Sequence, residues 1–343
     1  MNATGFLYDP ICLKHDTGPG HVERPARLLA ILARLQETEL WSEMEKIRPV
    51  PATRSQLELA HSREYIDQAE RDIRSGEPVL STDPALSTIP EFSPDLDPAL
   101  ASWIRARHMQ AMTRISPDSL AAALAASGAA VTAVDAVMDG HIQNAFCCVR
   151  PPGHHATRDA GMGFCIFNNV AIAARHARVR WGIDRVLIMD WDVHHGNGTQ
   201  DIFEADPSVF FVSSHESGIY PGTGHSEETG RGEARGTVLN IPFPAHTSED
   251  AFIRSWISRL LPAMERFQPG FVFISAGFDS HRDDLMGSLE MTAAGFGRMT
   301  QLALDIAERH AGGRLVSVLE GGYDLDALAE SVEAHVRALV EGG

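Results

Sequence analysis

The sequence predicts an α/β protein with a mostly parallel central sheet that is covered by helices on both faces. Short apolar runs alternate along the chain with longer amphipathic stretches, and several runs, such as residues 186–189 and 271–274, are almost continuously apolar. Strands of that composition are typical of parallel sheets, whose two faces are both buried. No internal repeat interrupts the alternation, so we expect one three-layer domain over residues 1–343.

The expected elements follow from hydrophobic periodicity and from the turn residues between apolar runs. Strands are expected where the apolar runs are short and continuous, at residues 5–8, 145–149, 185–190, 209–213, 237–242, 270–275 and 314–319. Helices are expected where apolar residues recur at helical spacing, at residues 117–138, 168–179, 248–267, 292–310 and 325–340.

One stretch, residues 77–116, breaks this alternation. Six prolines lie in it or next to it, at positions 78, 84, 90, 94, 98 and 117. A loop of this length in a compact domain is usually a lid or an interface element, and the alternative is a disordered excursion. Ile89, Phe92, Trp103 and Ile104 give it apolar surface to bury. We therefore expect a loop insertion that covers the pocket or joins two subunits of a homo-oligomer.

Composition narrows the classes of partner. The net charge is −17, from 29 basic and 46 acidic residues, so we expect no nucleic-acid partner and an attraction for cationic peptides or amines. Acidity that serves only solubility is the alternative. The N-terminus lacks the pattern of a signal peptide, and no window reaches the ~18 apolar residues of a membrane span, so we expect a cytoplasmic protein of bacterial type without a membrane partner. The four cysteines show no CxxC spacing, which favours buried thiols.

Polar clusters follow four of the expected strands directly. They comprise residues 150–155, 190–194, 276–279 and 320–323. The carboxyl ends of parallel strands share one edge of the sheet, where ligands bind in α/β proteins. We therefore expect these four clusters to meet in one crevice.

Three of these polar residues form a candidate metal site. Asp192 and His194 are two positions apart, so on an extended backbone their side chains point to the same side. Asp279 supplies a second carboxylate from another strand end. This set of two oxygens and one nitrogen suits Zn²⁺ or Fe²⁺ and leaves a coordination position open.

Candidate acid–base residues accompany the metal set. His154 and His155 stand in a turn after Pro151, Pro152 and Gly153, where two imidazoles could serve as general base and electrostatic partner. Asp190 and Asn197 are the available orienting groups, and one charged and one neutral orienting group would separate the two histidine pKa values. Tyr323 could donate a hydrogen bond to a polarised carbonyl, with a structural role as the alternative.

Taken together, these residues resemble the histone deacetylase superfamily. Its members have the arginase–deacetylase fold, a three-layer α/β/α fold with a mostly parallel eight-stranded sheet. With Asn197 at this position, the sequence resembles the class II-like branch, which includes bacterial histone deacetylase-like amidohydrolases and acetylpolyamine amidohydrolases. The matching motifs are residues 15–18 with 21–25, 150–155, 163–165 with 167–169, 190–199, 220–224, 276–279 and 320–323.

The resemblance implies a zinc-dependent amidohydrolase that removes acetyl or related acyl groups from amines. It assigns Zn²⁺ to Asp192, His194 and Asp279, the general base to His155, its electrostatic partner to His154 backed by Asp190, and carbonyl polarisation to Tyr323. Further implied sites are a substrate channel and a structural K⁺ site, with Arg27 in an acetate-release cavity. The channel would use Gly163, Phe164 and Tyr220, and the K⁺ site would use Asp190, Asp192, His194, Ser213 and Ser214.

The substrate is left open between two kinds of acetylated amine. Relatives carry a rim aspartate before the Ser-Pro that starts the long helix, and alignment on Ser116-Pro117 puts Met112 there. That change, the acidity and the insertion favour acetylated polyamines, whereas Phe164 favours acetyl-lysine of proteins or peptides. A di-manganese ureohydrolase of the arginase type is disfavoured by Val193 and His195. A non-catalytic acyl-lysine binder is disfavoured because no catalytic residue is missing.

Overall fold

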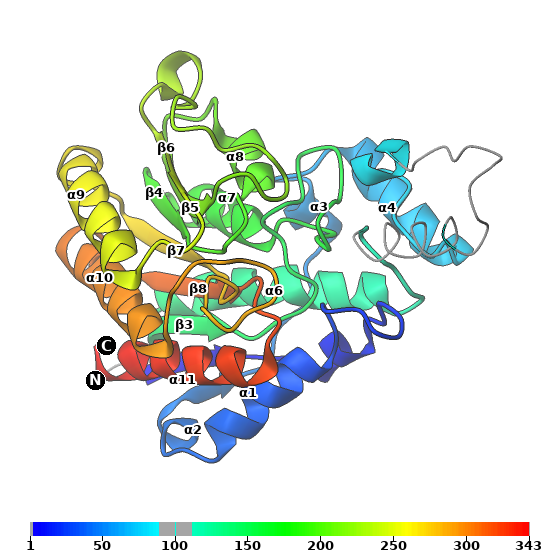
Figure 1. The fold of residues 1–343 in the computed structure, drawn as a ribbon, viewed down its shortest axis with the longest axis horizontal. Coiled ribbons are helices and arrows are strands. Elements are labelled where there is room, and N and C mark those ends of the chain that lie inside the picture. Colours follow the sequence, from blue (N-terminus) through cyan, green and yellow to red (C-terminus); the bar gives the residue numbers. More distant parts are fainter. Residues whose placement is uncertain (1–2, 89–99, 101–111, 343) are drawn as a thin grey trace.

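The computed structural model describes residues 3–88, 100 and 112–342. Eight parallel strands form one sheet in the order β2-β1-β3-β8-β7-β4-β5-β6 (Figure 1). The predicted α/β class is confirmed, and the sheet is parallel throughout. The strands are β1 (Ala3–Leu7), β2 (Glu45–Ile47), β3 (Ile142–Cys147), β4 (Val186–Asp190), β5 (Val209–Glu216), β6 (Val238–Phe243), β7 (Phe271–Ala276) and β8 (Leu315–Leu319).

Helices cover both faces of the sheet, which gives three layers. On one face α6 and α7 pack on the central strands, and on the other α1, α9, α10 and α11 pack on the sheet and on one another. The helices are α1 (Ala26–Gln36), α2 (Leu40–Glu43), α3 (Arg54–Leu57), α4 (Arg63–Ser75), α6 (Ser119–Met138), α7 (Asn169–Trp181), α8 (Asn197–Phe203), α9 (Glu249–Phe267), α10 (Ala293–Ala311) and α11 (Leu325–Glu341), with 3₁₀ turns at Pro10–Lys14, Pro84–Thr88 and Gly232–Ala234.

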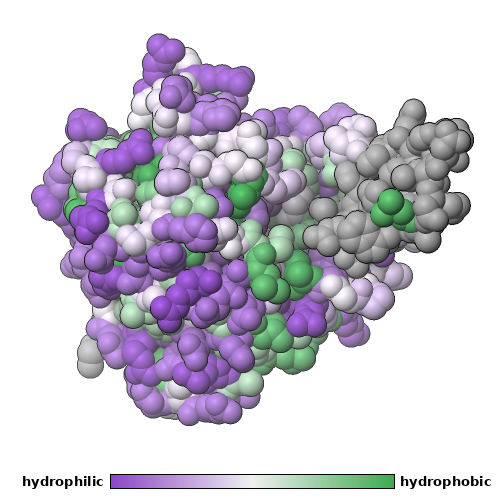
Figure 2. All heavy atoms as spheres, in the orientation of Figure 1, coloured by the Kyte–Doolittle hydropathy of each residue, from purple (hydrophilic) through white to green (hydrophobic). Residues whose placement is uncertain are grey.

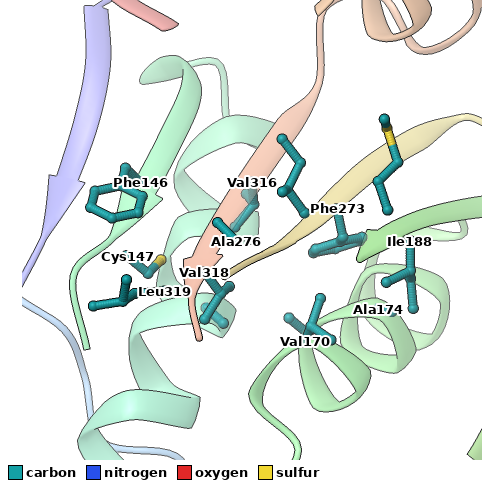
Figure 3. Close-up of a cluster of buried hydrophobic side chains, with 14 of the residues drawn as sticks. Phe146, Cys147, Val170, Ala174, Ile188, Phe273, Ala276, Val316, Val318 and Leu319 are labelled. Atoms are coloured by element: carbon teal, nitrogen blue, oxygen red, sulfur yellow. The ribbon is translucent and has the colours of Figure 1, made fainter. Parts of the chain in front are cut away.

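The core lies where the central strands meet α7. Every residue of β4, β7 and β8 is buried, as expected for strands that are covered on both faces. Figure 3 shows Ile188 of β4 and Phe273 of β7 facing Val170 and Ala174 of α7. This packing makes the strands a rigid base for the residues that follow them.

Strand register places the polar strand ends beside one another. Asp190 at the end of β4 pairs with Ser213 of β5 on one side and Ser275 of β7 on the other. The loops that leave β4, β7 and β8 therefore start at nearly the same height above the sheet.

All seven predicted strands are present, and β2 is an eighth that the sequence did not predict. β2 has only three residues, with the sequence Glu-Lys-Ile, which is too short to show alternation. Helices α1 and α4 were also missed. Both are amphipathic, and α1 buries Leu28, Ile31 and Leu35 at helical spacing.

The insertion at residues 77–116 is described only in part. Residues 89–99 and 101–111 lie outside the described residues, and with them Ile89, Phe92, Trp103 and Ile104. Its two ends lie side by side. Leu80 N donates to Thr113 O at 3.1 Å and Ile115 N donates to Pro78 O at 3.1 Å. The insertion therefore leaves and re-enters the domain at one point, and its role in oligomer formation stays a prediction.

Helix α6 corrects the expectation that no segment is long and apolar enough for a membrane span. Its residues Ser119–Met138 have a mean hydropathy of 1.7, so the helix is long and apolar enough for a membrane span by length and composition. The helix is mostly buried against β3, β8 and α7, which is the placement of a core helix. The exposed surface in the view of Figure 2 is mostly hydrophilic, in keeping with the net charge of −17.

Candidate active site

The four polar clusters that follow β3, β4, β7 and β8 meet at one edge of the sheet. Asp192, His194 and Asp279 bring one ligand atom each to positions within 4.8 Å of one another. His194 Nδ1 lies 3.0 Å from Asp192 Oδ1 and 3.2 Å from Asp279 Oδ2. All three side chains are buried. The predicted set of two carboxylates and one imidazole is thus assembled.

Backbone groups hold the two carboxylates in place. Val193 N donates to Asp279 Oδ1 at 2.8 Å, and Gly321 N donates to Asp192 Oδ2 at 2.8 Å. Asp279 Oδ2 is buried and receives no hydrogen bond of acceptable geometry from the described residues, although His194 Nδ1 lies 3.2 Å away. Buried polar atoms normally have a partner, so this oxygen fits a position that binds a metal ion.

The approach of the backbone at Gly321 completes the site. A Cβ at this position would lie 2.2 Å from Asp279 Oδ2 and 2.5 Å from Asp192 Oδ2. No side chain can be accommodated at such distances, so only glycine allows its N–H to reach Asp192 while leaving the space between the carboxylates free.

The charges of the site favour a bound cation. Burial and the nearby Asp192 carboxylate raise the pKa of Asp279. Burial disfavours the charged form of His194, but hydrogen bonds and attraction to Asp192 and Asp279 outweigh it and raise the pKa of His194. Two buried carboxylates need positive charge beside them, which a protonated His194 or a divalent ion would supply.

The two adjacent histidines have different partners. His154 Nδ1 lies 3.0 Å from Asp190 Oδ2, and His155 Nδ1 lies 2.7 Å from Asn197 Oδ1. The ring centroids of the two histidines are 4.0 Å apart. The two orienting groups that the sequence offered are thus assigned, with the carboxylate behind His154 and the amide behind His155.

These partners separate the pKa values of the pair. Burial opposes a charge on His154, but Asp192 and Asp190 outweigh it and hold the pKa of His154 well above its ordinary value. Burial and the positive charges of His154 and His194 hold the pKa of His155 well below its ordinary value. The opposite shifts favour a charged His154 beside a neutral His155, as a division of labour requires.

Tyr323 faces the same space from the end of β8. Its side chain is 8% exposed, and burial raises the pKa of Tyr323 well above 10 although Arg27 opposes the shift. The Arg27 guanidinium lies 4.9 Å from the ring centroid of Tyr323. The phenol therefore stays protonated and can donate a hydrogen bond.

A cavity of about 110 Å³ leads to these groups. Met286 was not among the predicted channel residues, since it follows β7 in a loop with no motif around it. Gly163 and Phe164 both have positive φ, 55° and 69°, which places the Phe164 ring against the cavity and brings Gly163 close to His155. The cavity is lined by His155, Gly163, Phe164, His194, Tyr220, Met286 and Tyr323.

Met112 is the residue that the sequence alignment put at the rim of the channel, a role that stays a prediction. It is fully buried and is not among the residues that line the cavity. Asp83, at the start of the insertion, accepts through its Oδ2 from Thr113 N at 2.8 Å. Burial and, to a smaller extent, the charge of Asp83 raise the pKa of Tyr220 on the cavity wall.

The remaining predicted residues lie near the site but outside the cavity. Ser213 and Ser214 are buried in β5, and Ser214 Oγ makes no hydrogen bond with the described residues. Arg27 is fully buried beneath Tyr323 and donates to Gly322 O at 2.6 Å and to Glu320 O at 2.5 Å.

A buried charge network supports this region and was not predicted from the sequence. Glu23 accepts from Arg150 through both carboxylate oxygens and from Arg27 Nη1 at 3.2 Å. His15 Nε2 lies 3.6 Å from Glu23. The network therefore ties the segment before α1 to the turn after β3 and, through Arg27, to the backbone around Tyr323.

Comparison with known proteins gives consistent matches over almost the whole chain. The model of the histone deacetylase domain matches residues 21–339. A probable deacetylase of Archaeoglobus fulgidus is 35% identical, over 99% of this chain and 86% of the relative. The polyamine deacetylase HDAC10 of Homo sapiens is 38% identical, over 99% of this chain and 47% of that protein. The crystal structure of the HDA15 HD domain matches with a TM-score of 0.85 and 33% identity, over 99% of this chain and 88% of that one.

Proposed function

The chain belongs to the histone deacetylase family, and we propose that it is a Zn²⁺-dependent deacetylase whose main substrate is acetyl-lysine in proteins or peptides. Its relatives make it a hydrolase that acts on amide bonds. The observation that carries the proposal is the convergence of Asp192, His194 and Asp279 with His155 and Tyr323 at the end of one cavity.

The donor set of Asp192, His194 and Asp279 would hold the metal. Three protein ligands with an open position are typical of catalytic zinc, and Fe²⁺ accepts the same donors. When bound, the ion supplies Lewis acidity, which polarises the amide carbonyl and lowers the pKa of a bound water. The buried Oδ2 of Asp279, which receives no hydrogen bond of acceptable geometry from the described residues, supports this assignment.

His155 is suited to accept a proton. Asn197 Oδ1 can only accept a hydrogen bond, so His155 Nδ1 carries the hydrogen and Nε2 is left as an acceptor. The lowered pKa keeps this imidazole neutral at neutral pH. His155 would therefore take the proton from the attacking water and later deliver it to the leaving amine. His154, held positive by Asp190, would stabilise the developing negative charge.

Tyr323 would bind the carbonyl oxygen of the substrate. Its raised pKa keeps the phenol protonated, and a donor aimed at the carbonyl stabilises negative charge best in the transition state. The cavity buries this donor away from bulk water, which strengthens the interaction.

The walls of the cavity favour a neutral, apolar stem. Phe164, Tyr220 and Met286 line it together with Gly163, and none of the described residues that line it is a carboxylate. A lysine stem of methylene groups can pack between such rings, whereas a charged polyamine chain would lose solvation without a partner. Acetylated polyamines are the second candidate, because the relative named polyamine deacetylase HDAC10 is 38% identical.

A structural K⁺ ion near Asp190, Ser213 and Ser214 is part of the same proposal. Asp190 pairs with Ser213 in the register of β4 and β5. The buried Oγ of Ser214, which lacks a hydrogen-bond partner among the described residues, supports an ion close by.

The test compares kcat/KM for an acetyl-lysine peptide and an acetylated polyamine, since specificity lies in this ratio. We expect turnover of both to need the metal, peptide to be preferred, and Tyr323→Phe to lower kcat about 100- to 1,000-fold with metal content unchanged. Tyr8→Phe, a tyrosine outside the cavity, is the matched control. Full activity after metal removal or in Tyr323→Phe would refute the mechanism, and a preference for polyamine would refute the substrate.

A further inference from the structure

Asp284 is a buried carboxylate in the loop between β7 and α10, and no step of the proposed reaction uses it. It is 7% exposed. Its Oδ2 accepts from Tyr323 N at 2.6 Å and from Asp324 N at 3.0 Å, and its Oδ1 accepts from Met286 N at 3.0 Å. One side chain thus binds three backbone N–H groups on two loops that follow different strands.

The turn that carries Tyr323 depends on such a restraint. Gly321 and Gly322 precede it, and Gly322 has a φ of 117° that favours glycine. The phenol of Tyr323 makes no hydrogen bond with the described residues, and its ring contacts Arg27 and Phe164. The position of the phenol is therefore set by the backbone at Tyr323, and hydrogen bonds to a charged acceptor are among the strongest that could hold it.

The other oxygen of Asp284 reaches the wall of the cavity. Met286, whose N–H it accepts, lines the cavity from the opposite loop. The same carboxylate therefore fixes the distance between Met286 at the wall and Tyr323 at the end of the cavity. No other described residue receives hydrogen bonds from both of these positions.

We propose that Asp284 is a positioning residue, which holds the phenol of Tyr323 in its catalytic place and couples it to the wall residue Met286. This inference rests on the proposed function. Displacing a catalytic group by about 1 Å can cost a factor of ~100 in rate, so losing this restraint lowers kcat while the metal ligands stay in place.

The test measures kcat, KM, metal content and thermal stability in Asp284→Ala and in two controls. Asp324→Ala removes the N-cap of α11, which accepts from Ala327 N at 2.9 Å, but keeps the Asp324 N–H. Asp283→Ala removes a neighbouring exposed carboxylate. We expect Asp284→Ala to lower kcat about 10- to 100-fold with metal content retained, and both controls to keep kcat. Equal loss of kcat in Asp324→Ala would assign the effect to helix stability and overturn the proposal.

Two further variants separate positioning from folding. In Asp284→Asn the amide oxygen can still accept from Tyr323 and Asp324, so we expect most of kcat to return and KM to rise through Met286. In a Tyr323→Phe background, Asp284→Ala should lower kcat by less than a further factor of about three, because both changes act through one phenol. The same factor in both backgrounds would refute the coupling.

Hydrogen exchange keeps the outcome independent of the proposed function. Mass spectrometry of residues 320–326 should show faster amide exchange in Asp284→Ala than in Asp283→Ala, even if the wild type turns over neither acetylated substrate. A wild type that turns over neither substrate would refute only the proposed function. Unchanged exchange in this segment would overturn the role of Asp284.

Discussion

Replacing Glu23 by glutamine should strongly destabilise the protein although the side chain keeps its shape. Glu23 is fully buried between Arg150, Arg27 and His15. Burial opposes its charge, but Arg150 and the other cations outweigh it and lower the pKa of Glu23 from 4.5 to about 2. At ~1.4 kcal/mol for each pKa unit, the ionised carboxylate contributes about 3 kcal/mol at neutral pH. Two arginines left without this partner raise the cost to about 3–5 kcal/mol.

Urea unfolding of the metal-loaded protein, followed by circular dichroism, measures this difference in the free energy of unfolding. The folded pKa of Glu23 lies below its unfolded value of 4.5, so the stabilisation is present above pH 4.5 and is lost as pH falls toward 2. The gap between wild type and Glu23→Gln should therefore shrink below pH 4.5. Glu58→Gln, which removes the exposed pairs with Arg54 and Arg63, should cost under ~1 kcal/mol. A cost for Glu23→Gln no larger than that of the control would refute the reasoning.

Three more outcomes are expected. Gly163→Ala should lower kcat/KM at least ~10-fold by steady-state kinetics, because its Cβ would lie 2.4 Å from His155 Cδ2 at a φ of 55°; an unchanged value would contradict the cavity geometry. Burial lowers the pKa of His61 to about 4 and of His335 to about 3, so each should cost stability below pH 6.5, about 2 kcal/mol at pH 5; a flat pH dependence of urea unfolding would contradict this. Chelation should abolish turnover and lower Tm, and added Zn²⁺ should restore both; an unchanged Tm after complete metal removal would argue against a metal between Asp192 and Asp279.

Local patterns predicted the central sheet because a strand that is buried on both faces has a continuous apolar run in its own sequence. The apolar runs of β4 and β7 could be recognised without knowing which strands pair with them. The polar residues after them indicated one edge of the sheet. Asp192, His194 and Asp279 were therefore predicted together although 87 residues separate Asp192 from Asp279. The roles given to these residues stay predictions until activity is measured.

Features that depend on contacts between distant segments were missed. The hydrogen bond from Thr113 to Asp83 joins the two ends of the insertion across 30 positions, so no local pattern predicted it. Met286 has no sequence signal, since its place at the cavity depends on how its loop packs beside Phe164 and Tyr220 from distant segments. Edge strand β2 owes its existence to pairing with β1 rather than to its own three residues.

The close approach at Gly321 also determines which sequence changes this site can accept. Every side chain at Gly321 adds a carbon within 2.5 Å of the carboxylates of both Asp192 and Asp279. Substitution libraries should therefore recover fewer functional variants at this position, which carries no functional group, than at Asp192, His194 or Asp279. The strictest requirement in this part of the chain is for empty volume, and such a requirement constrains evolution and protein engineering alike.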